Sequence, residues 1–293
     1  MTDLEPLFHH HGLQRLIPHL PQLARPSIRL LETEKTTDAG YSRLGGLPDT
    51  PADFTWPHSH DSLDKPLIFL GQLNWGELKP HDIENILPSS GGVLFFVNPG
   101  NADSCVVPLA EFAPQPVAPP PDLAYILPVQ HVRPHCEWTL PYYGFHGTIG
   151  GGDSRRCFFD VHWPEIEFFE LTDAERNAYE QLIAGIAHPG HFRHRLLGHS
   201  DTIQNPMRLD LERQARGISL DYENYLTLCD PQAPLTRGLK QQALESDWQL
   251  AFQISSFCSH HELWGDGGTY YFWIKKNDLN SPSPRFICEG QCG

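Results

Sequence analysis

The chain has 293 residues, which at about 150 residues per domain allows one large domain or two modest ones. Lys and Arg number 21 against 36 Asp and Glu, so the formal net charge is −15. This charge argues against nucleic acid and anionic membranes as partners, because both require a basic face. The 27 prolines and 24 glycines predict short strands and many turns rather than long helices.

Residues 1–14 contain no basic segment followed by an apolar run, so we expect no secretion signal and a cytoplasmic location. No stretch approaches the roughly 18 consecutive apolar residues of a membrane helix. The seven cysteines are widely spaced and odd in number, which favours reduced thiols over a disulfide framework.

Apolar runs predict strands at 27–32, 66–74 and 91–97, the last entered through a Gly-Gly turn. Residues 42–46 are interpreted as the end of a strand that runs into a Gly/Pro turn. Six prolines within 113–128 predict an extended connection with no regular structure.

Residues 172–186 have the clearest helical signal. Thr172 and Glu175 have the spacing of a capping box, in which each side chain bonds the other residue's backbone amide. Apolar side chains then recur at helical spacing until a Pro-Gly pair ends the pattern. A second helix is predicted over about 206–216.

One pattern occurs twice along the chain: an Arg-Leu-x-Gly segment, an apolar strand with Gln near its end, and a Gly-led aromatic strand. Arg43 and Gln72 belong to the first copy and lie 29 residues apart. Arg195 and Gln253 belong to the second copy and lie 58 residues apart, so the second copy contains a 29-residue insertion within about 205–240.

The repeat predicts an α+β, mainly β fold in which two similar β-rich halves arise from an internal duplication around a pseudo-twofold axis, with a few peripheral helices. The predicted halves cover about 27–112 and about 190–293. The Pro-rich segment 113–128 connects them, and the whole chain, 1–293, is expected to be a single domain.

Several linked segments resemble the YwqG-like family of bacterial proteins, a domain of unknown function (1963). They are SRLGGLPD (42–49), WP (56–57), FLGQL (69–73), EWTLP (137–141), HRLLGHSDTIQ (194–204), WQLAFQI (248–254) and WGDGGTYYFWI (264–274). The resemblance implies a mainly β, mixed α+β fold with internal duplication. It implies no catalytic residues. Because similar proteins occur beside bacterial toxin systems, it also implies that an immunity role is conceivable.

The candidate binding residues lie in these same segments. An arginine fork and a strand glutamine at matched repeat positions could line a pocket at the twofold axis, although such residues more often satisfy buried carbonyls and fix strand register. Asp266 lies in a Trp-Gly-Asp-Gly-Gly segment that favours a hairpin turn. The full set is Arg43, Gln72, Arg195, Gln204, Gln253, Trp264 and Asp266.

Histidines are unusually frequent, 17 in 293 residues. His188, His191 and His194 cluster around a helix exit and are weak candidates for a metal site, because imidazole groups at short spacing can hold zinc. His131, His135 and Cys136 form a second group. Neither an HExxH nor a paired CxxC pattern occurs, so we expect no metal and no other cofactor.

The sequence contains no nucleophile elbow and no phosphate-binding loop of the established types, so no catalytic residue is predicted. We interpret the chain as a non-catalytic protein-binding module. Its most concrete form is a cytosolic immunity protein that neutralises a cognate bacterial toxin, such as a nuclease, by masking a basic active site with an acidic surface. The alternative is a small-ligand-binding protein or enzyme with a pocket at the repeat interface, lined by the two Arg and two Gln residues at matched positions. The oligomeric state stays open.

Overall fold

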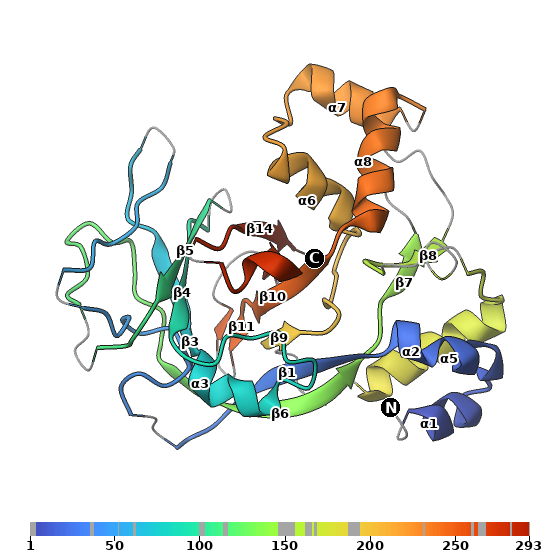
Figure 1. Ribbon diagram of the computed structural model, residues 1–293, viewed down its shortest axis with the longest axis horizontal. Helices are drawn as coiled ribbons and strands as arrows, with labels where there is room; N and C mark the ends of the chain where they lie inside the picture. Colours follow the sequence, from blue (N-terminus) through green and yellow to red (C-terminus); the bar gives the residue numbers. More distant parts are fainter. Residues whose placement is uncertain are drawn as a thin grey trace.

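A computed structural model provides the structure of the chain (Figure 1). The residues that it describes are 4–35, 38–51, 53–60, 63–99, 103–113, 117–145, 156–161, 166, 169–186, 194–230, 232–258, 261–262, 268–281 and 283–292.

A ten-stranded antiparallel sheet forms the body of the molecule, in the order β14-β13-β10-β9-β1-β6-β2-β3-β4-β5. Outward from the central β1–β6 pair, four strands follow on each side. The bounds of these strands are β1 Arg25–Glu32, β2 Arg43–Leu44, β3 Ile68–Asn74, β4 Gly92–Val97, β5 Ser104–Leu109, β6 Gln130–Thr139, β9 Arg195–Leu197, β10 Trp248–Ser255, β13 Thr269–Lys275 and β14 Phe286–Gln291.

The sheet curls so strongly that its two ends approach each other. The Ser104 side chain of the edge strand β5 is hydrogen-bonded to the Cys288 side chain of the opposite edge strand β14. Inside the curl, the Phe95 ring of β4 contacts the rings of Phe252 and Phe272, with centroids 4.8 and 4.7 Å apart. The main hydrophobic core therefore lies on the concave face, between the two sides of the sheet.

The predicted strands 27–32, 66–74 and 91–97 correspond to β1, β3 and β4. Their side chains are largely buried, which explains why the apolar signal is continuous rather than alternating. The described part of the Pro-rich segment, which is residue 113 and residues 117–128, contains no helix or strand, as predicted.

Helices lie at the periphery of the sheet (Figure 1). Their bounds are α1 Glu5–His10, η1 Gln14–His19, α2 Leu20–Leu23, α3 Trp75–Leu78, η2 Lys79–His81, α5 Asp173–Ile186, α6 Arg208–Ala215, α7 Tyr222–Cys229, α8 Pro234–Glu245 and η3 Lys276–Asp278. The capping box of α5 is confirmed, because the Thr172 amide donates to Glu175 Oε2 at 2.9 Å and the Glu175 amide donates to Thr172 Oγ1 at 3.2 Å. The predicted helix at 206–216 corresponds to α6.

A second core lies beside the sheet. The N-terminal helices pack with α5 and with the small two-stranded sheet of β7 (Tyr143–Phe145) and β8 (Arg156–Phe158) around the buried rings of Phe8 and Tyr179. Another two-stranded sheet consists of β11 (Phe257–Cys258) and β12 (His261–Glu262).

The predicted insertion is helical. Between β9 and β10 the chain forms α6, α7 and α8, which stand off one side of the sheet as a group, with α7 at the outer end (Figure 1). The mainly β class with peripheral helices is therefore confirmed. Among the described residues, no helix is long and apolar enough to cross a membrane.

Candidate functional site

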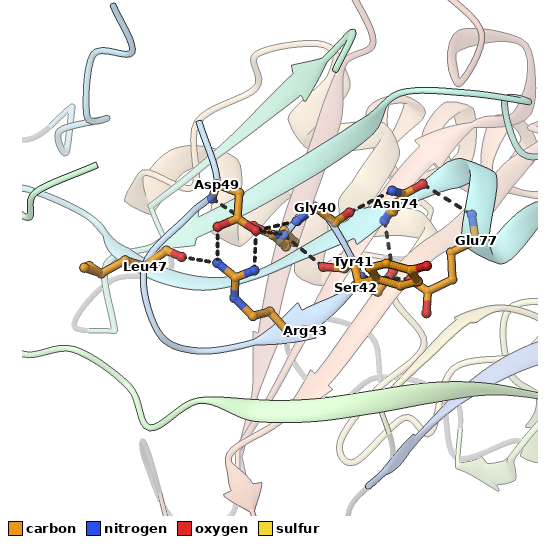
Figure 2. A network of polar contacts seen from close by, with 9 residues as sticks. Gly40, Tyr41, Ser42, Arg43, Leu47, Asp49, Asn74 and Glu77 are labelled. Carbon is orange, nitrogen blue, oxygen red and sulfur yellow. Dashed lines mark hydrogen bonds and ion pairs between the residues drawn. The ribbon is translucent and has the colours of Figure 1, made fainter. Parts of the chain in front are cut away.

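Arg43 of β2 is held by the carboxylate of Asp49 (Figure 2). Its Nη1 donates to Asp49 Oδ2, and its Nη2 donates to Asp49 Oδ1 at 2.8 Å and to the Leu47 carbonyl oxygen. Both charged side chains are buried. Because a guanidinium matches a carboxylate with two parallel bonds, this pair is directional as well as strong, and it fixes the turn that follows β2.

Gln72 of β3 lies opposite Arg43 in the sheet and is fully buried. Its Oε1 accepts from the Asp49 backbone amide at 3.0 Å, and its Nε2 donates to Asp49 Oδ2 at 2.8 Å and to the Tyr41 carbonyl oxygen at 2.9 Å. One glutamine therefore binds both the main chain and the side chain of the aspartate. Arg43, Asp49 and Gln72 are named the first polar set.

The Asp49 carboxyl is stabilised in its charged form. Burial alone would raise its pKa. The Arg43 guanidinium, the Gly40 amide (2.7 Å from Oδ2) and the Gln72 amide outweigh burial, so the pKa of Asp49 lies below its ordinary value of 3.8. At neutral pH the first polar set therefore contains a true buried ion pair.

Further polar residues extend the first polar set along α3 (Figure 2). The Asn74 amide donates to Ser42 Oγ at 3.0 Å, and Asn74 Nδ2 donates to the Gly40 carbonyl oxygen at 2.7 Å. The Ser42 amide donates to Glu77 Oε2 at 2.8 Å. These bonds attach the loop before β2 to the end of β3, where Asn74 also caps α3.

The second polar set consists of Arg195, Asp201 and Gln253, and its contacts repeat those of the first. Arg195 Nη2 lies 2.9 Å from Asp201 Oδ2. The Asp201 amide donates to Gln253 Oε1 at 2.9 Å, and Gln253 Nε2 donates to Asp201 Oδ2 at 2.7 Å. Arg195 and Gln253 are cross-strand neighbours, as Arg43 and Gln72 are.

Glu137 of β6 is a second carboxylate beside the arginine of the second polar set; the described contacts of the first polar set include no such second carboxylate. Its Oε1 lies 3.4 Å from Arg195 Nε, and its Oε2 lies 3.6 Å from Arg29 Nη1. Two buried arginines on β9 and β1 thus share one carboxylate. A cavity of about 20 Å³, with room for roughly one water, lies beside Glu137, Arg195 and Asp201.

The four matched residues form two separate pairs. β1 and β6 lie between β9 and β2 in the sheet. At about 4.8 Å between neighbouring strands, β9 and β2 are roughly 14 Å apart. All four side chains bond internal partners. The structure therefore places them as anchors of two turns and not around one shared pocket.

Sequence reasoning missed the two aspartates, although a signal for them was present. Asp49 and Asp201 each follow their arginine by six residues, at the end of the segments SRLGGLPD and HRLLGHSD. The Arg-x5-Asp spacing identifies the charge partner, because the turn after each short strand brings the sixth residue back beside the guanidinium.

Gln204 lies outside both polar sets. Its Nε2 donates to the Cys292 carbonyl oxygen at 2.6 Å, and its amide donates to Gln291 Oε1 at 3.0 Å. It therefore attaches the loop after β9 to the end of β14. The other two candidate binding residues, Trp264 and Asp266, lie outside the described residues.

Of the candidate metal ligands, His188 and His191 lie outside the described residues, and His194 is buried. His194 Nδ1 accepts from the Ser255 amide at 3.3 Å, which is a structural role. Burial, aided by the positive charge of Arg29, lowers the pKa of His194 to about 3, so the ring is neutral. Among the described residues, no three His, Cys, Asp or Glu side chains gather as metal ligands would.

In the other histidine group, Cys136 contacts a histidine that is distant in the sequence. Its Sγ lies 3.6 Å from His81 Nδ1 and 3.5 Å from the His81 carbonyl oxygen. This contact joins β6 to η2.

Two open grooves lie near these elements. One, of about 730 Å³, is lined in part by Tyr41, which accepts from Gln72 of the first polar set, and by Glu77 and Glu111. The other, of about 580 Å³, lies between the α6–α8 group and the sheet, where Trp248 Nε1 donates to Glu212 at 2.7 Å. The first groove is acidic, and the second mixes both signs of charge.

Comparison with known proteins identifies the family. A family model described as "Domain of unknown function (DUF1963)" matches residues 42–118 and 150–286, which is well over half of the chain and includes both polar sets. A search of the curated proteins finds no match. The predicted resemblance is thereby confirmed: the chain belongs to the DUF1963, or YwqG-like, family.

Proposed function

We propose that this chain is a non-catalytic protein-binding module, a cytosolic immunity protein that binds a cognate bacterial toxin and masks its active site. The observation that carries the proposal is the net charge of −15. A toxin that acts on a polyanion, as a nuclease does, has a basic active-site cleft. An acidic protein is attracted to such a cleft and can cover it.

The two polar sets support a scaffold function for the residues that first suggested a ligand site. In each set the carboxylate binds both the guanidinium and the side-chain amide, so these groups have partners inside the fold. Arg43, Gln72, Arg195 and Gln253 are all less than 10% exposed. A protein partner would therefore contact other residues, at the surface of the fold.

The test expresses the products of the genes beside the gene for this chain and takes as the toxin the product that kills cells on its own; if no such product exists, the proposal fails. Cells that express the toxin alone should die, and cells that also express this chain should survive. With purified proteins, the toxin's activity should fall to zero at one equivalent of this chain. Because the attraction is electrostatic, association should slow markedly between about 0.1 M and about 1 M salt, as the Debye length shortens from about 10 Å to about 3 Å. Survival without complex formation, or no protection at all, would refute the proposal.

We also propose that the two sides of the sheet arose by internal duplication. The turn after each arginine supports this, because Gly45 and Gly46 have φ of 63° and 73°, and Leu197 and Gly198 have φ of 60° and 70°. The sheet order is also the same outward from the centre on both sides.

Two finer correspondences support the same proposal. A register shift interrupts β3 between Phe69 and Gly71 and β10 between Leu250 and Phe252, each ending one residue before the glutamine of its polar set. The residue before each arginine accepts from the amide two residues after the glutamine: Ser42 Oγ from Asn74, and His194 Nδ1 from Ser255. An experimental structure in which the two sides do not superpose at these positions would refute the duplication.

A further inference from the structure

The helix α7 carries an apolar stripe on its outer face. Tyr222, Tyr225 and Leu226 are 76%, 40% and 50% exposed, and Leu220, just before the helix, is 52% exposed. Positions 222, 225 and 226 have the i, i+3, i+4 spacing that places side chains on one face of a helix. Four large apolar side chains within seven residues thus meet the solvent together.

The inner face of α7 already has its partner. Leu228 is buried, and Thr236 of α8 donates its hydroxyl to the Thr227 carbonyl oxygen at 2.8 Å. α7 packs on α8, which in turn packs on α6. α7 is therefore attached to the helical group by its inner face, and it lies at the outer end of that group (Figure 1).

The stripe is also held in a fixed conformation. Asp221 caps α7, accepting from the Asn224 amide at 2.9 Å, and the Ser219 hydroxyl donates to the same carboxylate at 2.6 Å. A preformed helix loses little conformational entropy when it binds a partner. Tyrosine is also among the side chains enriched in the energetically dominant parts of protein interfaces.

The charge around the stripe limits what can cover it. Asp221, Glu223 and Asp230 flank it, and residues 218–233 contain no Lys or Arg. With −15 on every chain, a second copy would be repelled at this acidic face. A partner with a basic rim and an apolar centre would gain both from burial of the stripe and from charge complementarity.

We propose that the exposed face of α7 is the docking surface for a protein partner that presents an apolar patch ringed by Lys or Arg. That this partner is a toxin rests on the proposed function. The docking surface itself lies on the helical insertion and not on either polar set.

The first experiment compares two matched double variants by their affinity for the toxin identified in the test of the proposed function. The test variant is Tyr225→Ser/Leu226→Ser, with side chains 40% and 50% exposed. The control is Tyr125→Ser/Ile126→Ser, at 40% and 47% exposed in the Pro-rich segment. The test variant should raise Kd about 30-fold or more, as loss of central interface anchors does, and the control should leave Kd unchanged. Unchanged melting temperatures would show that both variants fold.

Charge is tested separately with Glu223→Gln, which should weaken binding a few-fold and reduce its dependence on salt concentration. If the test variant binds as tightly as the original chain, or if the control variant loses affinity instead, the inference about α7 is wrong. In both cases the original chain still binds the toxin, so the proposed function stands.

The second experiment does not depend on the toxin. A photo-crosslinking amino acid replaces Tyr222 in one variant and Tyr125 in another, and each is irradiated in the source cells. The docking surface is supported if position 222, and not position 125, gives a single adduct with a protein of basic isoelectric point. Tyr225→Ser/Leu226→Ser should abolish that adduct. If that protein is no toxin, the proposed function fails and the docking surface stands. No adduct at 222, a homodimer, or an acidic partner overturns the inference.

Discussion

Leu197 and Gly45 each lie two residues after the arginine of their polar set, and both have left-handed backbone conformations, with φ of 60° and 63°. A left-handed conformation costs a residue with a Cβ about 1–2 kcal/mol. Leu197 is 1% exposed and lies in the main core, where burial of a leucine contributes roughly 1.5–3 kcal/mol and offsets that cost. The backbone geometry of this turn is therefore a stronger requirement than the residue type that provides it.

Gly45→Ala should destabilise the protein far more than Gly12→Ala. Both glycines have left-handed φ, 63° and 74°, so the conformational cost is shared. A Cβ on Gly45 would lie 2.0 Å from the Pro128 carbonyl oxygen, whereas one on Gly12 meets nothing within 4 Å. We expect Gly45→Ala to cost at least about 1–3 kcal/mol beyond Gly12→Ala. Urea unfolding of both variants measures the difference, and equal midpoints would contradict the clash.

Asp49→Asn and Asp201→Asn should both destabilise the fold, the first more than the second. Each change removes a carboxylate that pairs with a buried guanidinium, and breaking a fully buried pair costs about 3–5 kcal/mol. The Asp49 side chain is 4% exposed and that of Asp201 is 23% exposed, and Arg195 retains Glu137. Thermal unfolding of the two variants compares them directly. A larger loss of stability for Asp201→Asn would contradict this order.

His194 should make stability fall on acidification. Its pKa is about 3 in the folded chain, against an ordinary value of 6.5 that applies to the unfolded chain. Between pH 3 and pH 6.5 the unfolded chain therefore binds a proton that the folded chain does not. The contribution is therefore complete above pH 6.5 and is lost as pH falls toward 3. His194→Asn removes this titration. The stability of the variant relative to the original chain should rise as pH drops below 6.5, measured by urea midpoints; a constant difference would argue against a buried neutral ring.

Glu289 should act in the opposite direction. Burial, and then the charge of Asp210 hydrogen-bonded to it, hold the pKa of Glu289 well above 4.5. The folded chain thus keeps a proton that the unfolded chain releases, and stability falls as pH rises above 4.5. Glu289→Gln imitates the protonated form. It should match the original chain at acidic pH and exceed its stability at alkaline pH. Parallel pH profiles would show that the two carboxyls do not share a proton.

The sequence predicted the apolar strands and the best-capped helix well, because burial and capping are local signals. It did not reveal β6, which occupies the centre of the sheet. That strand contains Pro134 and alternates the buried Val132 with the exposed Arg133. Buried, half-buried and exposed residues are mixed along β6, so no continuous apolar run marks it.

The candidate site was predicted only in part for a related reason. Arg43, Gln72, Arg195 and Gln253 are found through repetition, and the structure places Arg43 beside Gln72 and Arg195 beside Gln253 on neighbouring strands, not all four around one pocket. Their aspartates depend on a turn with left-handed residues, which brings distant carboxylates back to the sheet. Side-chain partnership across such a turn depends on backbone conformation, and residue types alone do not specify it.

The helices α6, α7 and α8 interrupt one side of the sheet, between β9 and β10. The equivalent connection, between β2 and β3, contains no helix among its described residues. The surface of α7 is therefore present on one side of the sheet and has no counterpart among the described residues of the other side. A single chain is monovalent toward any partner that binds α7, so complexes should close at one-to-one stoichiometry instead of growing into networks.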